Sequence, residues 1–273
     1  DPAEGDNSQQ AEYDKSIRLT AKLPTILAAY IRRRRGEQPI PPDPSVGHAE
    51  NFARMTWGTK IHPRAVEVLN AAFILQAEHG MNASTFAARV TIATLSDLHS
   101  AITSAIGTLK GPLHGGANTR VMETLEKIDS SGQDPEQWVR EALERKERVM
   151  GFGHRVYKAV DPRATVLREL ADAIMQGKGE TRWLDLSDRV RAAMGTEMEQ
   201  RGKKIYPNVD FFSASVYTTL GIDKDLFTPI FAMSRVTGWT AHLFEQYANN
   251  RLIRPKADYT GPRGLKVTPL AER

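Results

Sequence analysis

Apolar residues recur at intervals of three and four along almost the whole of this 273-residue chain, in segments separated by glycine, proline and short polar stretches. Such spacing gives an α-helix one apolar face, whereas a half-buried β-strand needs an apolar residue at every second position. Alternation of the second kind is hard to find in the sequence. We therefore predict an almost entirely α-helical fold, with a core drawn from the 40% of residues that are hydrophobic.

A change from mostly apolar to more charged helical segments divides the chain into two predicted domains. Three glycines and a proline fall within the eight residues 111–118, GPLHGGAN, directly after a segment rich in small residues, 82–109, that we expect to form one long buried helix. The segments that follow contain more charged residues. The last long predicted helix, within residues 225–250, is again mostly apolar. We predict a large domain of residues 1–114 and 219–273, and a small domain of residues 115–218.

Composition excludes several kinds of chemistry and partner. The chain has no cysteine, which rules out disulfides, thiolate metal sites and cysteine nucleophiles. Lys and Arg exceed Asp and Glu by only 37 to 33, and the one dense basic run, residues 32–35, lies where cations complement a helix C-terminus. We expect no nucleic-acid partner. No apolar run reaches the roughly 18 residues that span a bilayer, so we expect no membrane partner and a cytoplasmic location.

Three histidines, His79, His114 and His154, adjoin glycines at predicted helix breaks. Histidine is the usual proton-transfer side chain near neutral pH, and a glycine-lined break admits a substrate, but each could equally be a structural residue of a turn. A zinc site is disfavoured because the three lie 35 and 40 residues apart, without a closely spaced pair. The glycines before His154 resemble those of a kinase loop, yet neither a strand pattern nor a His-Arg-Asp motif accompanies them.

Asp210 and three arginines are further candidates. Asp210 lies among apolar neighbours in IYPNVDFFSAS, where desolvation would raise its pKa and make it a stronger base, although helix N-capping explains an aspartate there equally well. Arg235 lies in the apolar segment IFAMSRVTGW, so its burial would require an anionic partner, either a ligand or a structural carboxylate. Arg163 follows an Asp-Pro pair and Arg254 precedes a proline.

Six segments together resemble the motifs of the citrate synthase family in order and spacing. They are AEHGMNAST, GPLHGGAN, GFGHRVYKAVDPRA, IYPNVDFFS, AMSRVTGW and NNRLIRPKADYTGP. The resemblance covers essentially the whole chain and implies that the family's N-terminal part is absent from it. It also implies a mainly α-helical homodimer, in which a large and a small domain flank a cleft that closes on the substrate.

The reaction that the resemblance implies joins the methyl carbon of acetyl-CoA to the ketone of oxaloacetate and then hydrolyses the thioester to citrate and CoA. Asp210 matches the family's general base, His114 the residue that stabilises the enol, and His154 the residue that protonates the ketone. A carbon acid this weak reacts only if a preorganised donor meets the charge developing on oxygen. No metal or cofactor is implied, since acetyl-CoA is a substrate.

Other matches concern substrate binding. Residues that match the family's oxaloacetate site or lie beside its base are His79, Arg163, Arg235, Arg254, Asn208 and Phe231. Arginine suits a dicarboxylate because a guanidinium and a carboxylate share two parallel hydrogen bonds. In the family, the arginine matching Arg254 acts in the partner subunit's site. Candidates for CoA binding are Gly151, Gly153, Arg155 and Lys158.

Two other functions remain compatible with this sequence. A 2-methylcitrate synthase has the same catalytic set and uses propionyl-CoA, and one extra methyl group is worth only about 1–3 kcal/mol in a pocket. General likeness to short bacterial citrate synthases favours acetyl-CoA. The missing N-terminal part also allows an inactive fragment or scaffold, although His114, His154 and Asp210 are all retained.

Overall fold

The computed structural model describes residues 1–58, 61–153, 159–178 and 181–273, and in these ranges the regular structure is helical, without a β-strand. The all-α prediction is confirmed. The first helices are α1 (Gln9–Arg34), α2 (His48–Trp57), α3 (Pro63–Ala77), α4 (Ala83–Ile92) and α5 (Leu98–Leu109). They are followed by α6 (Ala117–Ser131), α7 (Pro135–Glu144), α8 (Pro162–Lys178), α9 (Arg182–Gln200) and α10 (Val209–Thr219). A 3-10 turn, η1 (Lys224–Leu226), leads into α11 (Phe227–Ala248), and a second, η2 (Leu270–Glu272), lies near the C-terminus.

Local sequence signals account for most helix starts. Polar N-cap side chains that accept a backbone N–H from the first turn are those of Ser8, His62, Asn82, Asp97, Asp134 and Asn208. Proline occupies the first turn of α3 and of α7, where the missing N–H has no helical partner to lose. These caps satisfy donors that would otherwise be left unpaired at the helix ends.

The predicted single helix over residues 82–109 is wrong, because α4 and α5 are separate helices that pack against each other. Leu95 between them has a φ of 63°, a left-handed conformation that ends a helix, and Asp97 caps α5 by accepting the N–H of Ser100. Neither glycine nor proline marks this break. The apolar pattern therefore runs straight across it.

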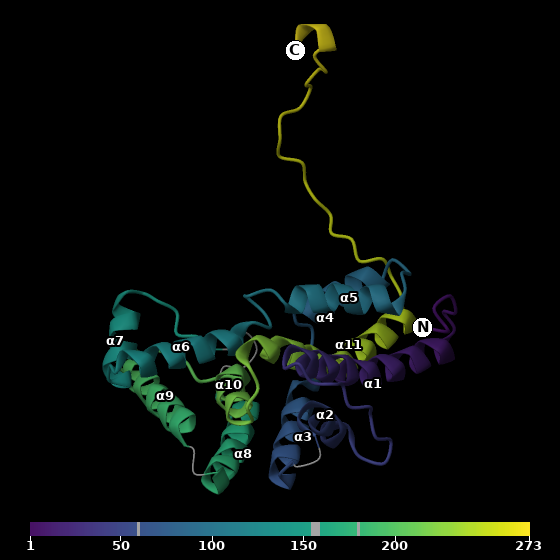
Figure 1. The fold of residues 1–273 in the computed structure, drawn as a ribbon. Coiled ribbons are helices and arrows are strands. Elements are labelled where there is room, and N and C mark those ends of the chain that lie inside the picture. The colour runs from purple at the N-terminus through teal and green to yellow at the C-terminus, as the bar shows by residue number, and fades with distance from the viewer. Residues whose placement is uncertain (59–60, 154–158, 179–180) are drawn as a thin grey trace.

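The central helix of the molecule is α11 (Figure 1). It contacts α1, with α4 and α5 on one side and α3 on the other, while α6 to α10 gather at one end of the molecule. One set of buried apolar side chains joins α1–α3 to α6–α10, and a second lies between α4, α5 and α11. Because α11 contributes to both sets, its polar side chains are held in fixed positions between the layers.

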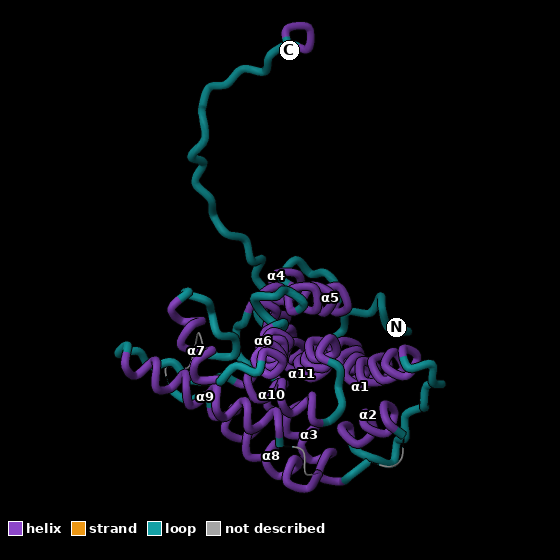
Figure 2. The backbone as a smooth tube through the Cα atoms, turned by 60° about the vertical axis from the view of Figure 1, so that its left-hand side comes forward, coloured by secondary structure: helices purple, strands orange, loops and turns teal. Residues whose placement is uncertain are grey.

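Residues 250–269, which follow α11, form an extended segment that projects from the helices (Figure 2). Nearly all of these residues are exposed. Among the helices that the structure describes, none combines the length and apolarity needed to cross a membrane.

Candidate active site

Five parts of the chain come together in one region. They are the loop between α3 and α4, the turn between α5 and α6, the start of α8, the start of α10, and α11 itself. Each carries at least one residue singled out from the sequence. Hydrogen bonds and electrostatic effects between these residues show that they share one region.

His114 lies in the turn between α5 and α6, and its ring is held by Ser84 at the start of α4. The backbone N–H of Ser84 points at Nε2 of His114 at 3.3 Å, and the Ser84 hydroxyl lies 2.8 Å from the same nitrogen. Because Nε2 accepts, the proton of the neutral ring is on Nδ1. Burial, and to a lesser extent the nearby Arg235, lower the pKa of His114 below its usual value. The ring is therefore a neutral hydrogen-bond donor at physiological pH.

Asp210 lies in the first turn of α10, but it is not the cap of that helix. Asn208 is the N-cap, and its side-chain oxygen accepts the N–H of Asp210 at 3.1 Å. Burial raises the pKa of Asp210 to about 6, against the opposing effects of Arg163 and Arg235. A carboxylate with this pKa is a stronger base than an exposed one and is still ionised near pH 7. Of the two interpretations of Asp210, the structure thus excludes the N-cap.

Arg235 is buried on α11 at 2% exposure. Its Nε donates to the backbone oxygen of Gln76 at 2.7 Å, and its guanidinium lies over the ring of Phe231, 4.7 Å from the centroid. Burial, together with Arg163, lowers the pKa of Arg235 to about 10, so the side chain remains charged at neutral pH. Within the described parts of the chain no carboxylate forms an ion pair with it. Glu78 and Asp210 act on its charge without contacting it, so the guanidinium is free to form a direct ion pair with an anionic ligand.

Asp161 was not identified from the sequence, although it holds the start of α8 against the start of α10. This buried carboxylate accepts from Nε of Arg163 at 3.1 Å, from Nη2 at 2.9 Å and from the backbone N–H at 3.0 Å, as well as from the N–H of Val209 at 3.1 Å. Burial raises the pKa of Asp161, but these bonds outweigh burial and hold it below its usual value. The Asp-Pro pair that begins α8 was the available signal.

Gly151 and Gly153 bring their loop against the start of α10. Both have φ near +80°, at 81° and 80°, which glycine adopts without strain. The Gly153 N–H donates to the Tyr206 oxygen at 2.8 Å, and the Asn208 N–H donates to the Gly151 oxygen at 2.9 Å. A Cβ on Gly151 would lie 2.7 Å from Val121. His154, Arg155 and Lys158 follow in the sequence and lie outside the described residues.

The remaining candidates divide into two groups. His79 is half-buried in the loop between α3 and α4, five residues before Ser84, and Phe231 is buried on α11 below Arg235. Arg254 is exposed and lies in the extended segment that follows α11. The structure thus brings together His114, Arg163, Asn208, Asp210, Phe231 and Arg235. His79 follows Glu78, a carboxylate that acts electrostatically on Arg235. In the described ranges no three His, Asp or Glu side chains are placed to hold a metal ion.

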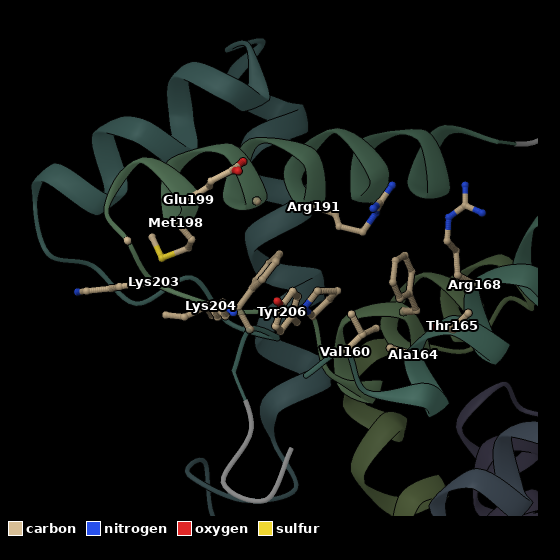
Figure 3. Close-up of a pocket in the computed structure, with 16 residues that line it drawn as sticks. Val160, Ala164, Thr165, Arg168, Arg191, Met198, Glu199, Lys203, Lys204 and Tyr206 are labelled. Carbon is tan, nitrogen blue, oxygen red and sulfur yellow. The ribbon is translucent and has the colours of Figure 1, made fainter. Parts of the chain in front are cut away.

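A pocket of about 950 Å³ opens next to the Gly151 loop, between α8, α9 and residues 202–207 (Figure 3). Phe152 and Tyr206 are among the aromatic side chains that line it. Its basic side chains are Arg168, Arg191, Lys203 and Lys204. Among the described lining residues Glu199 is the one acidic residue, and Asp188 pairs with Arg168 at 2.7 Å and with Arg191 at 3.2 Å, so four cations face two carboxylates. The lining is therefore electropositive.

Comparison with known proteins decides the family. A family model described as "Citrate synthase, C-terminal domain" matches residues 1–256. The chain belongs to the citrate synthase family. It is 53% identical over 264 residues to citrate synthase 2 of Bacillus subtilis, which covers 97% of this chain and 69% of that protein. It is 45% identical over 261 residues to a 2-methylcitrate synthase of Mycobacterium tuberculosis, covering 96% and 64%.

A solved structure of the family has the same fold. The citrate synthase of Thermoplasma acidophilum, described as a ternary complex with carboxymethyl coenzyme A and oxaloacetate, superposes with a TM-score of 0.88 at 36% identity, over 97% of this chain and 70% of that one. The family inferred from the six motifs is confirmed. This chain spans about two thirds of the length of the citrate synthases that it matches.

Proposed function

We propose that this protein is a citrate synthase, an acyltransferase that condenses acetyl-CoA with oxaloacetate and hydrolyses the resulting thioester to citrate and CoA. The observation that carries the proposal is the pairing, in one buried site, of a carboxylate whose pKa burial raises to about 6 with a neutral histidine whose ring is oriented by a backbone N–H. Relatives named citrate synthase support the same reaction.

In the first step, Asp210 takes a proton from the acetyl methyl group. The electron pair of that C–H bond becomes the C=C bond of an enol, and the thioester oxygen gains charge. Nδ1–H of His114 donates a hydrogen bond to this oxygen and lowers the barrier. The two groups act together because the carbon acid is far weaker than a carboxylic acid, so base and donor are both needed.

In the second step, the enol carbon attacks the ketone carbon of oxaloacetate, and the ketone oxygen takes a proton as the C–C bond forms. The family resemblance assigns this proton to His154. Water then cleaves the thioester to release CoA and citrate. No metal or cofactor enters this sequence, in which acetyl-CoA is consumed as a substrate.

The dicarboxylate is proposed to bind between Arg163 and Arg235, with His79, Asn208 and Phe231 completing its pocket. Support comes from the charge of Arg235, which is buried without a carboxylate partner among the described residues. Phe231 covers one face of that guanidinium and so leaves its edge for a carboxylate. Arg163 is held in place by Asp161.

The nucleotide end of CoA is proposed to bind in the pocket shown in Figure 3, next to Gly151 and Gly153. Its cations suit phosphate groups, and Phe152 or Tyr206 suits an adenine ring. Arg155 and Lys158 remain candidates for the same ligand.

We further propose a homodimer in which Arg254 enters the partner's site. The exposure of Arg254, in a segment that leaves the body of its own subunit, supports this. Residues 115–218 would form the small domain, closing on a large domain of residues 1–114 and 219–273 once oxaloacetate is bound.

The test compares CoA release by the intact protein with oxaloacetate and either acetyl-CoA or propionyl-CoA. We expect a higher kcat/KM for acetyl-CoA. Propionyl-CoA is included because the chain also has relatives named 2-methylcitrate synthase. A clear preference for propionyl-CoA would replace the proposal with 2-methylcitrate synthase, and no turnover with either would favour the scaffold.

A further inference from the structure

Three side chains on one face of α11 reach the loop between α3 and α4. Arg235, Trp239 and His242 are four and three residues apart, a spacing that aligns them along one side of a helix. Each contacts an acceptor in the loop or at one of its ends. The acceptors are, in the same order, the Gln76 carbonyl oxygen at 2.7 Å, the Ser84 hydroxyl at 3.1 Å and a Glu78 carboxylate oxygen at 3.0 Å.

Gly238, on the same face, brings the backbone of α11 against this loop. A Cβ on Gly238 would overlap the carbonyl oxygen of Ala77 and lie 3.1 Å from Cα of Glu78. The obstacles are backbone atoms, so no side-chain rotation could relieve the overlap. Any larger residue must push the loop away from α11.

The contact made by Trp239 continues to His114. The Ser84 hydroxyl, which accepts the indole N–H of Trp239, is also the group 2.8 Å from Nε2 of His114. Trp239 is fully buried. Together with Asn82, whose Oδ1 accepts from the Ser84 hydroxyl at 2.8 Å, the indole fixes the serine that orients the His114 ring.

The contact made by His242 continues to His79. Oε1 of Glu78 accepts from Nε2 of His242 and also from the N–H of Gly80. Through this oxygen, His242 is linked to the residue before His79 and to the residue after it. Glu245 and Arg89 face the other ring nitrogen of His242, at 3.4 and 3.5 Å. The His242 ring is therefore held from both sides.

We propose that Gly238, Trp239 and His242 are positioning residues, through which α11 sets His79 for oxaloacetate and His114 for the acyl thioester. The proposal rests on the proposed function, because it uses the roles of those two histidines. It predicts that neighbouring residues of one helix face affect different kinetic constants.

His242→Leu removes the donor to Glu78 and is expected to raise KM for oxaloacetate about tenfold, the scale of one hydrogen bond to a charged group, with kcat within twofold. His242→Gln retains a nitrogen donor at similar reach and is expected to restore KM to within threefold of the wild type. An unchanged KM in His242→Leu, or equal KM values in the two variants, would overturn this role.

Trp239→Phe keeps an aromatic ring but removes the N–H that reaches Ser84. We expect kcat to fall about tenfold while KM for oxaloacetate changes less than twofold, because the ring of His114 is misoriented. Trp57→Phe in α2, a tryptophan outside this contact, is the matched control and should leave both constants unchanged. A kcat equal to that of the control would contradict the role of Trp239.

Gly238→Ala should raise KM for oxaloacetate at least tenfold and also lower kcat, since the whole loop moves. Gly107→Ala is the matched control, a helical glycine in α5 whose added Cβ would meet nothing within 4 Å. If Gly238→Ala does not fold, Trp239→Phe and His242→Leu test the proposal.

Wild-type values of kcat and KM in every folded variant would overturn the proposal. A wild-type protein without turnover would instead overturn the proposed function.

Discussion

Burial gives Asp210 the properties of a base. Its neighbours at the start of α10 are apolar, and desolvation raises its pKa to about 6 although Arg163 and Arg235 oppose the rise. The same desolvation lowers the pKa of His114 and keeps that ring neutral. Burial therefore raises the pKa of the carboxylate, which becomes a stronger base, and lowers the pKa of the histidine, which stays an uncharged donor.

The pH dependence of the reaction follows from Asp210. The base must be ionised to act, and its pKa lies near 6, so kcat/KM for acetyl-CoA should fall about tenfold for each pH unit below 6. Above that pKa, raising the pH should bring little further gain from this group. A pH series of initial rates checks this, and a profile that stays flat down to pH 4.5 would contradict it.

At the scale of elements, α8 and α10 are joined through Asp161. The carboxylate accepts the first-turn N–H groups of both helices and holds Arg163 with two further bonds. Negative charge is favoured at a helix N-terminus, and here one charge serves two of them. The link also sets how the start of α10, and thus Asp210, lies relative to Arg163.

Asp161→Asn should destabilise the protein by about 3 kcal/mol, because a buried arginine loses its charged partner. Asp188→Asn, which removes a more exposed partner of Arg168, is the matched control and should cost about 1 kcal/mol or less. Urea unfolding of the two variants measures the difference. Equal losses would mean that the Asp161 link contributes no more than a surface ion pair.

At the scale of the whole molecule, Arg254 is the dicarboxylate-binding candidate that lies exposed beyond the last long helix. It lies in the segment that projects from the helices (Figure 1). A site completed by a second subunit explains this position, and the proposed dimer follows from it.

Mixing two inactive variants tests the shared site. In a hybrid of Arg254→Ala and Asp210→Asn subunits, one site contains both substitutions and the other contains neither. Random exchange makes half of the dimers hybrids with one intact site each, so we expect recovery of about one quarter of wild-type activity. No recovery after verified subunit exchange would exclude Arg254 acting in the partner's site.

Sequence patterns predicted the helical fold and the residues that motifs carry, because period and motif are local properties. They did not identify Asp161 as a link, since its partner Val209 is 48 residues away. Ser84 was missed for the same reason, lying 30 residues from His114. The break between α4 and α5 was missed because Leu95 adopts a positive φ without glycine or proline.

The kcat of Asp210→Asn, measured with both substrates saturating, tests the central assignment most directly. A Tm series confirms folding first. Burial raises the folded-state pKa of Asp210, so its ionised form costs stability above about pH 6, and the Asn variant should have a Tm at or above the wild type at pH 8, with less advantage toward pH 5. The account predicts that kcat falls by about 10²–10⁴-fold in this folded variant. A kcat within threefold of the wild type would contradict Asp210 as the base.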